Sequence, residues 1–140
     1  MTTVIRRVRF SAGHRVWGHE HECANIHGHN YVVFFHATAD QLDDVGRVID
    51  FRVLQARLGG WINANWDHAF LCHRDDEQAR AAMAQLPGQR VYLLDCNPTA
   101  ENLAYYLLHV VGPRELEGTG VRVTRVVLWE TENCYAEVSV

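Results

Sequence analysis

A thiol and two histidines stand close together in the stretch CANIHGHNY, which begins at Cys23. Four residues after that thiol comes the triplet His27-Gly28-His29, at the start of a run with strand character. Side chains two apart on a strand point to the same face, so His27 and His29 can reach one ion. His14, at the end of an earlier apolar strand, supplies a third imidazole. Three histidines with an open fourth position are typical of a catalytic zinc site.

Other interpretations of these residues stay open. Histidines often satisfy ordinary hydrogen bonds, and Cys23 as a fourth ligand would make a closed, structural zinc site in a non-catalytic module. A zinc hydrolase is less well supported, because the chain has no His-Glu-x-x-His helix. His19 and His21 lie in a polar loop and are expected at the surface. The grouping of one thiol with three imidazoles favours a metalloenzyme.

The length and composition of the chain argue against several classes of function. A length of 140 residues fits one domain over 1–140, and the formal net charge of −4 gives no support for nucleic-acid or anionic-membrane binding. All 13 basic residues are arginine, so a lysine Schiff base or lysine general base is excluded. Any phosphate would therefore be bound by arginine, backbone amides or hydroxyls. No segment approaches the roughly 18 apolar residues of a membrane helix.

The cysteines indicate a reducing compartment. They form neither a Cys-x-x-Cys pair nor a compact disulfide framework, and arginines interrupt the N-terminal segment where a signal peptide would be apolar. We therefore expect a cytoplasmic protein. The four cysteines are Cys23, Cys72, Cys96 and Cys134.

Hydrophobic periodicity predicts the elements that position these residues. Residues 4–14 alternate, with apolar side chains and His14 at even positions, which predicts a strand with His14 facing inward. Residues 27–39 predict a second strand, with both faces at least partly covered. Asp50 is a plausible N-cap for a helix through Ile62, although the two glycines at 59 and 60 weaken it by roughly 1 kcal/mol each.

The second half of the chain predicts two more helices and a hairpin. A short helix is expected over 75–86, followed by an apolar run over 91–94. Asn97 is predicted as the cap of a further helix, with proline at its first position. Residues 121–130 and 134–140 predict a terminal hairpin. The result is an α+β domain with a four-stranded antiparallel sheet and helices on one face. Open edges and an uncovered face on such a sheet predict a homo-oligomer.

Six motifs, in order along the chain, resemble the 6-pyruvoyltetrahydropterin synthase family. They are FSAGHR (10–15), CANIHGHNY (23–31), VIDF (48–51), WDHAFL (66–71), NPTAEN (97–102) and LWETENCYAEV (128–138). The resemblance implies the tunnelling fold, in which ββααββ subunits assemble through their sheets into barrels. It also implies trimers stacked as hexamers, with active sites at subunit interfaces.

The resemblance assigns a role to each site residue. His14, His27 and His29 match the zinc ligands of the family, and Cys23 matches its catalytic base. A thiol of reference pKa ~8.5 needs nearby positive charge or metal to act as a base near neutrality.

Further matches concern proton transfer and substrate binding. Asp67 and His68 match the pair that carries a second proton transfer, and Glu130 matches the carboxylate that anchors the pterin. Thr99 and Glu101 lie in the second pterin-contacting segment of the family. In an unrelated protein, an Asp-His dipeptide would usually be part of a turn, and Thr99 and Glu101 would be ordinary residues of a first helical turn.

The spacing Cys-x3-His-Gly-His resembles the bacterial 6-carboxytetrahydropterin synthases, zinc-dependent lyases of queuosine and related pathways. They convert 7,8-dihydroneopterin triphosphate to 6-carboxy-5,6,7,8-tetrahydropterin, acetaldehyde and triphosphate without an external redox cofactor. A pyruvoyl product, or cleavage of a related pterin such as sepiapterin, is the nearest alternative. The connection over 72–96 is longer than in compact bacterial members and is expected to reshape the rim of the pocket.

Overall fold

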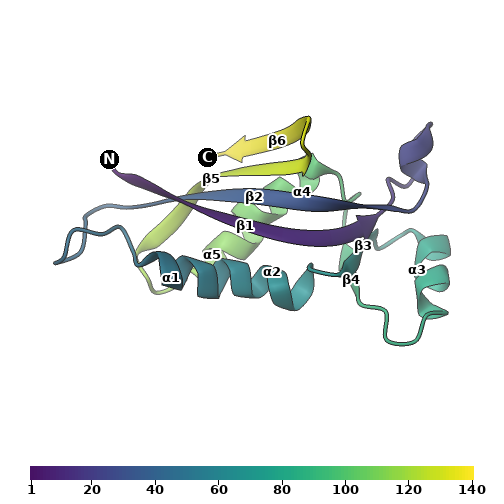
Figure 1. Ribbon diagram of the computed structural model, residues 1–140, viewed down its shortest axis with the longest axis horizontal. Helices are drawn as coiled ribbons and strands as arrows, with labels where there is room; N and C mark the ends of the chain where they lie inside the picture. Colours follow the sequence, from purple (N-terminus) through teal and green to yellow (C-terminus); the bar gives the residue numbers. More distant parts are fainter.

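A mixed six-stranded sheet forms the frame of the protein, in the order β4-β3-β1-β2-β5-β6 (Figure 1). The computed structural model describes residues 1–140. The predicted terminal hairpin is confirmed, and it turns at Glu132 and Asn133. The strands are β1 (Thr3–His14), β2 (His27–Ala39), β3 (Ala69–His73), β4 (Val91–Leu94), β5 (Val121–Thr131) and β6 (Cys134–Ser139).

Two long helical segments lie on one side of this sheet, and a short helix, α3, stands apart beside β3 and β4 (Figure 1). Each long segment contains a π-helical stretch between two α-helical ones. The first consists of α1 (Phe51–Leu54), Gln55–Gly59 and α2 (Gly60–Asn65). The second consists of α4 (Ala100–Tyr106), Leu107–Val111 and α5 (Gly112–Glu115). The short helix α3 covers Glu77–Ala84, which confirms the helix predicted over 75–86.

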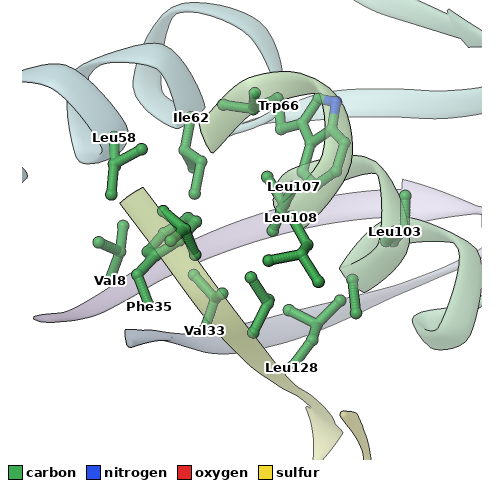
Figure 2. Close-up of a cluster of buried hydrophobic side chains, with 14 of the residues drawn as sticks. Val8, Val33, Phe35, Leu58, Ile62, Trp66, Leu103, Leu107, Leu108 and Leu128 are labelled. Atoms are coloured by element: carbon green, nitrogen blue, oxygen red, sulfur yellow. The ribbon is translucent and has the colours of Figure 1, made fainter. Parts of the chain in front are cut away.

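Alternate side chains of the central strands build the core between sheet and helices. The buried positions are even-numbered in β1 and mostly odd-numbered in β2, as the predicted strand alternation requires. Leucine and isoleucine side chains of both helical segments pack against them, and burying apolar surface in this way is the main force that stabilises the fold. Figure 2 shows this contact through Val8, Val33, Phe35, Leu58, Ile62, Leu107, Leu108 and Leu128.

Both predicted helix starts are present, but one cap residue is wrong. Asp50 caps the first segment, and its side chain accepts a hydrogen bond from the backbone N–H of Arg52 at 2.8 Å. Thr99, and not Asn97, caps the second, with its hydroxyl accepting from the backbone N–H of Asn102 at 3.1 Å. The helix therefore begins two residues later than predicted, and Thr99 satisfies one of its own orphan amides.

The prediction of a four-stranded antiparallel sheet is wrong, because β3 and β4 add to β1 in parallel. Both are apolar runs of four or five residues, and such runs do not distinguish a short strand from other buried segments. Parallel neighbours need a crossover of a dozen or more residues, usually with a helix. The segment 74–90, which contains α3, makes that crossover. The long 72–96 connection is therefore largely part of the sheet and its crossover.

The outer strands leave backbone edges unpaired. β1 pairs with β2 along its whole length, but with β3 only through Ala12–His14. The rest of that edge of β1, and the outer edge of β6, have no strand beside them in this chain.

None of the helices is long and apolar enough to cross a membrane.

Candidate metal centre and active site

Three imidazoles meet at the end of the β1–β2 pair. The antiparallel register places His14 directly opposite His27 and places Ala12 opposite His29. His27 and His29 are two apart on β2 and share its inward face. Each of the three histidines has one ring nitrogen that could bind a metal ion, and these three nitrogens lie within 4.8 Å of one another. The structure therefore brings together the three predicted metal ligands.

Backbone carbonyls fix the ring orientation of two of these histidines. The Nδ1–H of His14 donates to the carbonyl of Pro98 at 2.6 Å, and the Nδ1–H of His27 donates to the carbonyl of Asn25 at 2.7 Å. A carbonyl only accepts, so the proton of each neutral ring is on Nδ1 and each Nε2 carries a lone pair. These two Nε2 atoms face each other at 3.1 Å.

Two lone pairs at that distance repel each other unless a cation lies between them. The third member, His29, has a buried Nε2 atom without a hydrogen-bond partner. A buried polar atom of this kind is costly when it stays unsatisfied. Imidazole nitrogens are suitable ligands for zinc and similar ions. The three residues therefore fit a metal ion held by His14, His27 and His29.

Burial keeps the rings of His14 and His29 neutral, as ligands must be. Desolvation lowers the pKa of His14 to about 4, against the opposing effect of the Pro98 carbonyl, and the neighbouring histidines lower it further. The pKa of His29 is also lowered by burial, while the carboxylate of Glu130 acts in the opposite direction. Ligand nitrogens are thus available for metal at neutral pH.

Glu130 lies next to the histidine cluster. Its Oε1 is 3.5 Å from the Nε2 atom of His29, and its side chain is about one-quarter exposed. Glu130 and Glu101 both line a cavity of about 450 Å³ beside β6. A hydrogen-bonding ligand in this cavity would meet two carboxylates, of which that of Glu130 lies beside His29. Thr99, the third predicted contact, uses its hydroxyl to cap α4.

Cys23 lies in the 3-10 turn Glu22–Ala24, between β1 and β2. The side chain is half-buried, and the backbone carbonyl accepts a hydrogen bond from the N–H of Val16 at 2.8 Å. The compact cluster of ligand atoms consists of the three histidines and does not include Cys23. This arrangement leaves the thiol near the cluster in sequence but outside its set of ligands.

Asp67 and His68 form a hydrogen-bonded pair at the unpaired edge of β1. Asp67 accepts from the backbone N–H of Ser11 at 2.9 Å and pairs with the Nδ1 atom of His68 at 2.9 Å. The ring of His68 is 81% exposed, and its backbone φ of 57° is unusual for a residue with a Cβ. Burial raises the pKa of Asp67, but the Ser11 amide and His68 outweigh it, so the net pKa is lowered.

This pair makes no hydrogen bond or ion pair with the histidine cluster of the same chain. Asp67 lines a cavity with Arg7, Arg9 and Asn30, whose side chains alternate with the inward-facing residues of β1 and β2. His68 lines a neighbouring cavity together with His29, and with Met83 and Leu86 from the crossover. The crossover thus contributes to the wall of this cavity.

Sequence reasoning missed the backbone groups and the ion pair that hold the site. The carbonyls of Pro98 and Asn25 have no side-chain signature, so no motif could indicate them. Arg15, next to His14, is bound by Asp76, with its Nε donating to a carboxylate oxygen at 2.6 Å. Asp76 is buried and also caps α3, which explains how the crossover helix is attached to the end of β1.

The arrangement of sheet and helices is that of solved pterin synthases. It matches 6-pyruvoyltetrahydropterin synthase of Plasmodium vivax with a TM-score of 0.70 at 17% identity, covering 100% of both chains. It also matches a protein of Wolinella succinogenes with a TM-score of 0.80 at 24% identity, covering 99% of this chain and 97% of the other. At these identities the likeness defines the fold.

Sequence comparison defines the family. A family model described as 6-pyruvoyl tetrahydropterin synthase matches residues 3–140. A Rickettsia bellii protein named 6-carboxy-5,6,7,8-tetrahydropterin synthase is 38% identical over 138 residues, which is 99% of this chain and 100% of that protein. An Aquifex aeolicus protein of the same name is 30% identical over 156 residues, covering 96% and 95%. The chain belongs to the 6-pyruvoyl tetrahydropterin synthase family.

The Arg15–Asp76 pair gives a pH-dependent prediction. The hydrogen bond from Arg15 holds the pKa of Asp76 below its usual range, so the charged carboxylate stabilises the fold above ~pH 4 and this contribution is lost as pH falls through the lowered pKa. We expect Asp76→Asn to be less stable than the wild type by about 1–3 kcal/mol at pH 7. The difference should shrink as the pH falls below ~4, and it should close only below the lowered pKa, where the wild-type carboxyl is also neutral.

Urea unfolding at several pH values and fixed protein concentration measures this difference. Asp95→Asn is the matched control, because Asp95 pairs with Arg74 at 2.8 Å while its side chain is 87% exposed. Exposed ion pairs contribute little to stability, so the free energy of unfolding of this control should stay close to that of the wild type. A difference for Asp76→Asn that is the same at pH 7 and pH 3 would contradict this account.

Proposed function

We propose that the protein is a zinc-dependent lyase that converts 7,8-dihydroneopterin triphosphate to 6-carboxy-5,6,7,8-tetrahydropterin, releasing acetaldehyde and triphosphate. The observation that carries the proposal is the cluster of three imidazoles with converging nitrogens, in a chain of this family. The full-length relatives named 6-carboxy-5,6,7,8-tetrahydropterin synthase support this product over a pyruvoyl product.

His14, His27 and His29 would hold the zinc ion. Bound there, zinc supplies Lewis acidity that makes the C–H protons beside the substrate side-chain oxygens easier to remove. Three protein ligands leave one coordination position for those oxygens, as catalytic sites require. The location of Cys23 outside the ligand cluster supports this open site over a four-ligand structural one.

Glu130 would anchor the pterin ring. A carboxylate can accept two hydrogen bonds from the edge formed by the 2-amino group and N3 of a pterin. Its place beside His29 would put the side chain of the bound substrate next to the metal ligands. Glu101, in the same cavity, would add a second acceptor at its wall.

Cys23 and the Asp67–His68 pair would move protons. The thiolate of Cys23 would take a proton from the substrate side chain, and the imidazole of His68 would serve the adjacent carbon. Asp67 accepts from the Nδ1–H of His68, which leaves Nε2 of the exposed ring free to exchange a proton.

Two copies of the chain would build each active site. In one chain, the Asp67–His68 pair lies at an unpaired strand edge and makes no hydrogen bond or ion pair with the three histidines. The unpaired edges of β1 and β6 can pair between copies. Such pairing would bring His68 of a second copy towards Glu130 and Cys23 of the first. We therefore propose a homo-oligomer, a trimer or hexamer, with shared sites.

The reaction itself is the first test. Zinc-loaded protein incubated with 7,8-dihydroneopterin triphosphate should form 6-carboxytetrahydropterin and acetaldehyde, identified by mass spectrometry. Cys23→Ser should slow the reaction by roughly 100-fold or more, because general-base catalysis contributes about 10²–10⁴-fold. Cys72→Ser is the matched control: this buried thiol donates to the carbonyl of His73, which serine can also do, and it should retain activity.

Other outcomes of this assay are informative. A pyruvoyl product would agree with the proposed roles of the site residues, but it would contradict the proposed product. An absence of turnover, with zinc bound tightly by wild type and weakly by Cys23→Ser, would contradict catalysis and favour the structural-zinc module.

Shared active sites predict complementation between two inactive variants. Cys23→Ser and His68→Ala should each be nearly inactive alone. After co-expression, roughly a quarter of the interfaces should combine an intact Cys23 with an intact His68, since each interface draws its two chains independently. Activity should rise to about that fraction of the wild-type value. Activity that stays at the level of the separate variants would show that each chain builds its site alone.

A further inference from the structure

The side chain of Asn97 joins two segments that are far apart in the sequence. Its Oδ1 accepts a hydrogen bond from the backbone N–H of Trp17 at 2.9 Å, and its Nδ2 donates to the carbonyl of the same residue at 2.9 Å. A side-chain amide that pairs with both polar groups of one backbone residue holds that residue in position and direction. Trp17 lies three residues after His14, where the chain leaves β1.

The helix does not need this side chain. Thr99 caps α4, although the sequence predicts Asn97 as the cap. The backbone of Asn97 is fixed as well, because its carbonyl accepts from the N–H of Thr99 at 2.9 Å and from the Nδ2 of Asn102 at 3.0 Å. Asn97 is thus held from both sides, and its amide is free to hold Trp17.

The residue after Asn97 touches the metal centre. Pro98 is buried, and its carbonyl accepts from the Nδ1–H of His14 at 2.6 Å. This hydrogen bond determines which nitrogen of His14 carries the lone pair. The position of the Pro98 carbonyl relative to His14 depends on how the 97–98 segment is attached to the end of β1, and the paired amide of Asn97 makes that attachment.

We propose that Asn97 is a positioning residue for the metal centre, which fixes the Pro98 carbonyl against His14 and so presents the Nε2 of His14 to the ion. Outer groups that orient ligating histidines typically change metal affinity by 10–100-fold when they are removed. Here the group that orients His14 is the carbonyl of Pro98, and Asn97 acts indirectly by holding that carbonyl in place. The inference rests on the proposed function, since it presumes that the three histidines bind metal.

The same amide stabilises the segment that leads to Cys23. The N–H of Val16, next to Trp17, donates to the carbonyl of Cys23 at 2.8 Å. Loss of the Asn97 contact would therefore loosen the start of the Cys23 loop together with the orientation of His14. A residue with a purely structural role elsewhere in the fold would affect neither.

Zinc affinity of purified Asn97→Ala, measured by competition with a chromophoric chelator, tests the inference. We expect binding to weaken by about 10-fold or more. The visible spectrum of the cobalt-loaded protein should change as well, because it reports the geometry of the ligands. Asn65→Ala is the matched control: it removes a side-chain hydrogen bond of 2.9 Å, to the carbonyl of Trp61, away from the metal centre. It should bind zinc as the wild type does.

Asn97→Asp provides a second variant of nearly the same size. It keeps the acceptor for the N–H of Trp17, but it loses the donor and places a carboxylate against the Trp17 carbonyl. Its zinc affinity should also fall, which decides the question if Asn97→Ala does not fold. A folded Asn97 variant with wild-type zinc affinity and an unchanged cobalt spectrum would overturn the inference. A wild-type protein that binds no zinc would instead contradict the proposed function.

Discussion

The close approach of two imidazole lone pairs is the constraint on which the site depends. The Nε2 atoms of His14 and His27 are 3.1 Å apart, and backbone carbonyls hold the proton of each ring on the opposite nitrogen. Such an arrangement is unfavourable unless a cation lies between the two atoms. The β1–β2 register and the burial of His14 maintain it, so a large part of the fold serves to keep three ring nitrogens together.

Much of the site could be predicted from the sequence, because its side chains lie on regular strands. The alternation in residues 4–14 correctly predicts that His14 faces inward, and the spacing of His27 and His29 correctly predicts that they share a face of β2. The groups that orient them could not be predicted, since the Pro98 carbonyl has no side-chain signature. Asn97 was assigned to the helix cap because a cap and a long-range contact use the same residue types.

The sheet was predicted less well than the site. Two strands were missed because runs of four or five apolar residues carry little periodicity. The parallel pairing of β3 and β4 depends on the crossover through α3, whose attachment by Asp76 to Arg15 is visible only in three dimensions. The Asp67–His68 pair lies at the edge that these strands leave open. A motif can thus identify candidate site residues without revealing which of them the fold brings into contact.

The central claim is that zinc binds to three imidazoles and leaves Cys23 free. X-ray absorption spectroscopy of the zinc-loaded protein tests it most directly. The account predicts a first shell of nitrogen and oxygen atoms only, at about 2.0–2.1 Å, from the three histidines and one solvent or substrate oxygen. A sulfur atom at about 2.3 Å would place Cys23 on the metal. That result would contradict both the open site and the role of the thiol as a base.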